Sequence, residues 1–266
     1  MTEIVSNPKV VSNTKVVSYQ NVTNMNEAVV DAIAEKASAA IRQQGTFHIA
    51  LAGGSTPKSI YELMATEHYQ KILPWSNIHF YFGDERCVPA DHPDSNYRMA
   101  TQALLAKVPV PEGNIHAVNI DLKNIAASAE RYEDELKKHL PITSGTPVFD
   151  LVLLGIGDDG HTASLFPGTD ILTETRKWVA AVYVEKFNAW RISLTYPVIN
   201  AAANVFVIAA GSGKQKILKE VLSSEPVDDP YPVQRIRPSG ELVWYIDSAA
   251  AALLPKTILK QQEEPK

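Results

Sequence analysis

The stretch FDLVLLGIGDDGHTASLFPG, residues 149–168, begins with the clearest core strand of this 266-residue chain. Its first half is a short apolar run, as expected of a strand buried on both faces of a sheet. Four runs of the same kind lie elsewhere and are separated by segments with helical periodicity: FHIALA from Phe47, NIHFYF from Asn77, ANVFVIAAG from Ala203 and ELVWYI from Glu241. This alternation predicts an α/β fold with a mostly parallel sheet that is covered by helices on both faces.

The remaining elements follow from periodicity and capping signals. We expect a strand over Lys15–Tyr19, a short NIHAV strand from Asn114, and a small antiparallel pair formed by WVAAVYV (from Trp178) and RISLTY (from Arg191). Helices are expected after a capping box of Asn24 and Glu27, and over 57–69, 95–106, 125–139 and 214–222, with Asp247 capping a last helix. Residues 1–14 are expected to be a loose arm and 15–266 a single domain, although the linker-like PITSGTP from Pro141 allows a boundary.

Composition limits the classes of function. The net charge is −5 and both signs are interspersed, so no nucleic-acid partner is expected. The sequence lacks a signal peptide and an apolar run long enough for a membrane span, which predicts a soluble cytoplasmic protein, taken as a monomer or weak homodimer. A single cysteine, Cys87, excludes an intrachain disulfide and a thiolate metal cluster.

Parallel sheets bind ligands at the carboxyl ends of their strands, which directs attention to the loops there. In AGGSTPKS, Gly53 and Gly54 allow close backbone approach, with Thr56 suited to cap a helix and Pro57 to its first position. Such a helix start favours an anion, typically phosphate, although a tight turn explains the same residues. In GSGK, Lys214 fits an anion at a second helix start, although the loop alone favours a solvated lysine.

The loop GDDGHTASLFPG holds the strongest candidate for chemistry. His161 can act as an acid or a base, and a neighbouring carboxylate, Asp158 or Asp159, can fix its tautomer. After NIHFYF, Arg86 fits a phosphate clamp or an ion pair with Asp84 or Glu85, and Cys87 lacks a nearby histidine base. The other histidines show no metal-ligand spacing, so no metal site is expected: His48, His68, His79, His92, His116 and His139.

Taken together, the motifs AGGSTP, GDERCVP with DSNYRMA, LGIGDDGHTASLFP, RISLTYPVINAA and AAGSGK resemble those of the 6-phosphogluconolactonases, in the same order from about residue 24 to the end. The resemblance implies a doubly wound, Rossmann-like fold, no metal or organic cofactor, and hydrolysis of 6-phospho-D-glucono-1,5-lactone in the oxidative pentose phosphate pathway. It implies His161 as the catalytic residue, with Asp159 and Asp84 as candidate orienting carboxylates. Substrate or phosphate binding falls on Gly53, Gly54, Ser55, Arg86, Arg191 and Lys214.

Two alternatives keep part of this pattern. A glucosamine-6-phosphate deaminase or other aldose-phosphate isomerase also needs a phosphate loop and a histidine. A non-catalytic sugar-phosphate sensor would keep the glycine loop and Lys214 without needing His161.

Overall fold

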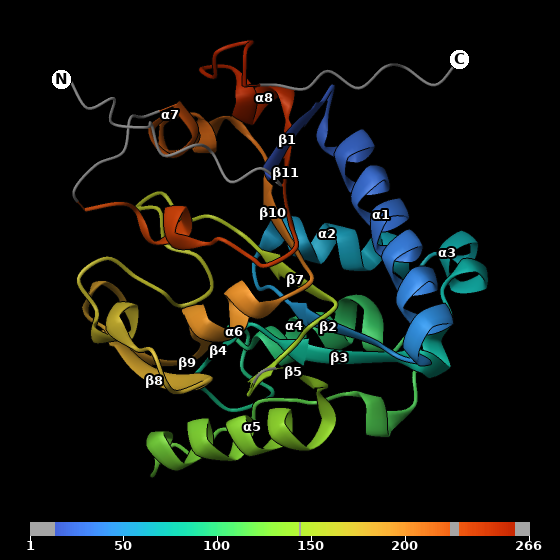
Figure 1. Cartoon of the computed structure of the whole chain (residues 1–266), viewed down its shortest axis with the longest axis vertical. Helices are drawn as coiled ribbons and strands as arrows, with labels where there is room; N and C mark the ends of the chain where they lie inside the picture. Colours follow the sequence, from blue (N-terminus) through green and yellow to red (C-terminus); the bar gives the residue numbers. More distant parts are fainter. Residues whose placement is uncertain (1–13, 144, 224–228, 259–266) are drawn as a thin grey trace, which may run out of the picture.

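The computed structural model describes residues 14–143, 145–223 and 229–258 (Figure 1). The arm expected over residues 1–14 therefore lies outside the described residues except for Thr14, which is the first residue of a strand. Residue 144 and residues 224–228 also lie outside them.

A six-stranded sheet forms the centre of the molecule. Its order is β1 (Thr14–Tyr19), β11 (Glu241–Asp247), β10 (Asn204–Ala209), β7 (Leu151–Leu154), β2 (Phe47–Leu51) and β3 (Ile78–Phe82). Every pairing within it is parallel, which confirms the predicted fold class. The strand β7 lies between β10 and β2, and all four of its residues are buried, as its unbroken apolar sequence predicts.

Eight α-helices among the described residues pack around the two larger sheets. They are α1 (Val22–Gln44), α2 (Ser55–Met64), α3 (Glu67–Ile72), α4 (Asn96–Ala100), α5 (Ile125–His139), α6 (Tyr196–Ala201), α7 (Gln215–Ser223) and α8 (Ser248–Ala251). In Figure 1, α1 runs along one side of the molecule and α5 along the lower edge, where it packs against β8 and β9 of the second sheet.

That second sheet is antiparallel, in the order β4 (Asp84–Arg86), β9 (Ala189–Leu194) and β8 (Val179–Val184). The predicted pairing of the last two is confirmed, whereas β4 is an additional strand that the sequence pattern does not predict. The expected linker contains a short hairpin of β5 (Ile142–Thr143) and β6 (Thr146–Pro147). No helix of the described part combines the length and apolar character required to cross a membrane.

Several predicted element boundaries are wrong. The cap of α1 is Asn21, whose side chain accepts from the Asn24 N–H at 2.9 Å, so the helix begins before the expected capping box. The helix expected over 57–69 begins at Ser55 and breaks after Met64 into two, and α7 begins at Gln215 after a short 3₁₀ turn. Of the expected NIHAV strand, a single bridge between Ile115 and Phe80 forms.

Candidate active site

A cavity of about 250 Å³ opens at the carboxyl ends of β2, β3 and β7, the place that parallel-sheet topology favours for a ligand. Six predicted site residues line it: Gly53, Gly54, Asp84, Arg86, His161 and Lys214. The other three, Ser55, Asp159 and Arg191, do not line it. The cavity thus unites loops that lie up to about 160 positions apart in the sequence (214 − 53).

His161 is held by a carboxylate. Its Nδ1 lies 2.5 Å from Oδ1 of Asp159, and the second oxygen of that carboxylate accepts from Lys186 Nζ at 2.9 Å. Burial alone would raise the pKa of Asp159, but the hydrogen bonds from Lys186 and His161 outweigh it and hold that pKa well below its usual range. Asp159 therefore stays ionised and keeps Nδ1–H as the donor, which leaves Nε2 as the basic nitrogen.

Two neighbours fix the imidazole ring. Phe166 stacks on His161 with ring centroids 3.9 Å apart. At Gly157 the backbone comes so close that an added Cβ would lie 1.9 Å from His161 Nδ1. The glycine at 157 is therefore a steric requirement of the histidine's position.

Asp84 has a different role from Asp159. It is buried at 8% exposure, and its carboxylate accepts from Ser164 Oγ at 2.6 Å and from Asn96 Nδ2 at 3.3 Å. It thereby ties the histidine loop to β4 and to the start of α4. Glu85, 2% exposed, likewise accepts three backbone N–H groups, so it stabilises the loop before α4.

The glycine loop places a helix start at the cavity. Gly54 is the N-cap of α2 and has φ 103°, and no side chain caps this helix end. Thr56, expected to be the cap, lies one residue inside the helix. A Cβ at Gly53 would lie 2.1 Å from Asn96 Oδ1. The backbone of the glycine loop therefore packs directly against the Asn96 side chain at the start of α4. An uncapped helix N-terminus of this kind attracts an anion.

Three cations lie at or beside the cavity. Arg86 donates to the Asp94 carbonyl at 2.7 Å, and it is the cross-strand partner of Arg191. Burial, and then the charge of Arg86, lower the pKa of the Arg191 guanidinium. Lys214 Nζ lies 2.6 Å from the exposed carboxylate of Asp158. Two neighbouring guanidinium groups can both form charge-assisted hydrogen bonds with an anion that lies between them.

Sequence reasoning missed four residues of this arrangement. Lys186, Ser164 and Asn96 act through contacts that only the fold brings about. The fourth, Ala163, lines the cavity with φ 46°, an uncommon backbone conformation for a residue with a side chain. Cys87 agrees with expectation, because burial raises the pKa of its thiol to about 11 and keeps it protonated.

The parallel sheet, with a helix start and a carboxylate-bound histidine at the carboxyl ends of its strands, has a Rossmann-like arrangement. The model of the family "Glucosamine-6-phosphate isomerases/6-phosphogluconolactonase" matches residues 20–244. The chain belongs to this family.

The similar proteins that follow are named 6-phosphogluconolactonase, one of the two names in the family description. A "6-phosphogluconolactonase" of Nostoc is 47% identical over 85% of this chain and 92% of its own length. One from Synechocystis is 42% identical over 84% of this chain and 91% of its own. A solved structure, "6-phosphogluconolactonase from Trypanosoma cruzi", superposes with a TM-score of 0.83 at 30% identity, covering 93% of this chain and 99% of that one.

Proposed function

We propose that this protein hydrolyses 6-phospho-D-glucono-1,5-lactone to 6-phospho-D-gluconate, the lactone-opening step of the oxidative pentose phosphate pathway. The observation that carries the proposal is the pairing of His161 with Asp159 beside a cavity that also holds Arg86, Lys214 and the start of α2. A basic nitrogen and an anion site within one small cavity suit a phosphorylated ester. The names of the relatives supply the lactone.

The chemistry assigned to His161 is general base catalysis. With Nδ1–H donating to Asp159, Nε2 takes a proton from water while the water oxygen forms a bond to the lactone carbon C1. As the tetrahedral intermediate collapses, the bond from C1 to the ring oxygen breaks and that oxygen receives the proton. Because Arg191 does not line the cavity, we assign the oxyanion to a backbone N–H of the loops that do.

The phosphate is assigned to the opposite end of the substrate. The start of α2, Arg86 and Lys214 together offer backbone N–H groups, a planar guanidinium and an ammonium group. For Lys214 to bind phosphate, the substrate must replace the Asp158 carboxylate, and an exposed pair of this kind costs little to break. Holding the remote phosphate fixes C1 against His161, which is where positioning raises the rate.

The test compares two variants with freshly generated lactone. In His161→Ala we expect kcat to fall about 10²–10⁴-fold with little change in KM, since the base is lost and the anion site is kept. In Lys214→Met we expect mainly a higher KM, since a binding contact is lost. The lactone also opens spontaneously, so each rate is corrected with an enzyme-free reaction at the same pH.

The same preparation separates the alternatives. Near-normal turnover by His161→Ala would refute the base assignment. Release of ammonia from glucosamine 6-phosphate by the wild type would instead indicate a deaminase. Binding of 6-phosphogluconate without acceleration of lactone opening would indicate a sensor.

A further inference from the structure

A second group of titratable side chains lies toward the amino ends of β2 and β3, at the opposite sheet edge from the cavity. His79, the second residue of β3, places its Nδ1 3.1 Å from Nε2 of His116. The other nitrogen of His116 lies 2.8 Å from Glu135 Oε1, and His139 Nε2 lies 3.3 Å from that oxygen. The proposed hydrolysis makes no use of this group.

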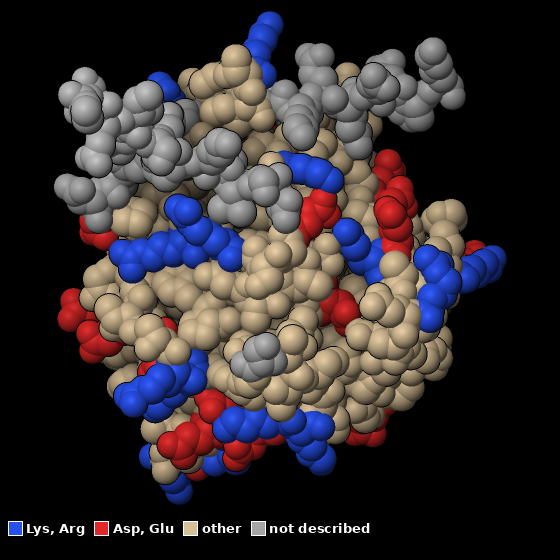
Figure 2. Space-filling model, viewed as in Figure 1, with Lys and Arg blue, Asp and Glu red and all other residues tan. Residues whose placement is uncertain are grey.

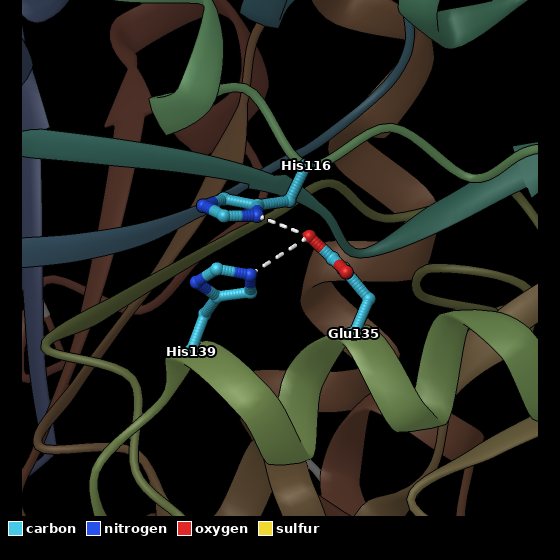
Figure 3. Close-up of side chains that lie close together, drawn as sticks. All are labelled: His116, Glu135 and His139. Atoms are coloured by element: carbon cyan, nitrogen blue, oxygen red, sulfur yellow. Dashed lines mark hydrogen bonds and ion pairs between the residues drawn. The ribbon is translucent and has the colours of Figure 1, made fainter.

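We infer that His116, Glu135 and His139 form a binding site for one divalent transition-metal ion of the zinc type. Their three ligand atoms lie within 4.8 Å of one another. Figure 3 shows both imidazole rings pointing at the same carboxylate oxygen. Two imidazoles and a carboxylate are ligands that zinc accepts, and tetrahedral bonds of about 2.0–2.1 Å place ligand atoms roughly 3.3 Å apart. The His139 contact already has that spacing, and the His116 contact must open by about 0.5 Å, within reach of the half-buried Glu135 side chain.

His116 is positioned before any ion arrives. Its side chain is 2% exposed, and its ring stacks on Tyr81 with centroids 4.2 Å apart and planes within 8° of parallel. When Nδ1 binds an ion, Nε2 carries the proton and donates it to His79 Nδ1. A partner of this kind fixes the tautomer and orientation of a ligating histidine.

The other two ligands come from the carboxyl-terminal end of α5. Glu135 and His139 are four residues apart and therefore lie on one face of the helix. The helix carboxyl end carries partial negative charge, which favours a cation, whereas the nearby charge of Lys138 opposes it. Glu135 and His139 are 36% and 28% exposed, so an ion can enter and water can complete its coordination.

The sequence predicts no metal site, because ligand spacing gives no sign of this one. His116 lies 19 positions before Glu135 and directly follows Ile115, which bridges to Phe80 of β3. The bridge and the packing of α5 bring the three residues together. The site therefore adds a metal ion at the sheet edge remote from the cavity, where it would join α5 to the segment that bridges to β3.

The experiment titrates Zn²⁺ and Co²⁺ into the full chain after chelator treatment and dialysis. We expect one equivalent per chain, a Co²⁺ absorption spectrum typical of four-coordinate sites, and a rise in Tm of roughly 5 °C at a hundredfold excess over Kd. His139→Ala and the isosteric Glu135→Gln should each weaken binding roughly tenfold or more. If His139→Ala fails to fold, the binding of Zn²⁺ by Glu135→Gln, compared with that by the wild type, tests the proposal.

Two control variants separate this site from other histidine–carboxylate pairs. His161→Ala removes the pair in the cavity, and His92→Ala removes the surface pair with Asp94. Both should bind Zn²⁺ like the wild type. The proposal is overturned if the wild type binds no ion, if Glu135→Gln binds as tightly as the wild type, or if His161→Ala alone abolishes binding.

Discussion

Asp159 is the residue on which the geometry of the histidine depends. One of its oxygens meets His161 and the other meets Lys186, so a lysine from the turn after β8 helps to set the charge beside the base. Asp84, although buried at the same cavity, instead binds Ser164 and Asn96. Of the two carboxylates that the sequence left open, the contact with His161 belongs to Asp159.

Asp159→Asn should lower kcat about 10²-fold and leave KM within about twofold. The neutral amide neither stabilises the imidazolium nor enforces Nδ1–H, while the anion site is untouched. Steady-state kinetics on the lactone measures both constants. The matched control is Asp158→Asn, which removes the neighbouring carboxylate from Lys214 and should change KM but not kcat. An Asp159→Asn enzyme with wild-type kcat would remove this residue from the mechanism.

The residue types at the site follow from the sequence, but their contacts do not. A histidine in a glycine-rich loop after a buried strand is visible as a candidate base. That Lys186 reaches across 27 positions to Asp159 depends on where the β8–β9 hairpin lies. Likewise, the requirement for Gly157 appears only when the ring position is known.

At the scale of single elements, backbone conformation decides where helices end. The longest helix, α1, stops at Gly45, which has φ 87° and whose N–H donates to the Ile41 carbonyl at 2.9 Å. A Cβ there would meet no atom within 4 Å. The glycine is therefore required by conformation alone, not by space.

Gly45→Ala should lower the free energy of unfolding by about 1 kcal/mol, because the left-handed conformation disfavours a side chain. Urea denaturation monitored by circular dichroism gives this value. Gly113→Ala is the control, since that glycine also has open space around it but lacks a positive φ, and we expect a change below about 0.5 kcal/mol. Equal losses in both variants would contradict the conformational explanation.

Most helices and strands could be predicted because their apolar periodicity is strong. The predictions that were wrong or missing share a physical cause. The helix expected over 57–69 breaks after Met64, although its apolar pattern runs on. β4 is three residues long and carries charged side chains, so it forms only because β9 is there to pair with it. Short or interrupted elements depend on tertiary partners that local sequence does not encode.

For the whole molecule, the buried histidines connect stability to pH. His48 is 3% exposed and forms hydrogen bonds with Tyr81 and Thr46. Burial, followed by the charges of His79, His116 and His139, lowers its pKa to about 4.

Charged side chains of both signs lie on the surface of the molecule. In Figure 2, Lys and Arg side chains form small groups, with Asp and Glu among them and no continuous basic stripe on the side shown.

Stability should fall as the pH drops from about 6.5 to about 4. In that range the unfolded chain protonates His48 and the folded chain does not, so stability present above pH 6.5 is lost on acidification, by about 3 kcal/mol in full. Urea melts at pH 7, 5.5 and 4.5 in chelator measure it. His48→Gln should flatten the dependence, whereas His68→Gln, at an exposed position on α3, should not. An unchanged slope in His48→Gln would refute this assignment.

The position of β11 between β10 and β1 has a consequence for how the protein is made. β1 pairs with a strand that begins more than 220 positions later (241 − 19 = 222), so it leaves the ribosome long before its neighbour exists. At about 5–20 residues per second, it waits roughly 10–45 s. In the last part of that interval, after β10 has been made, the nascent chain also exposes the β10 edge that β11 will cover. Synthesis of this protein therefore includes a period in which its first strand and its growing sheet are open to chaperones.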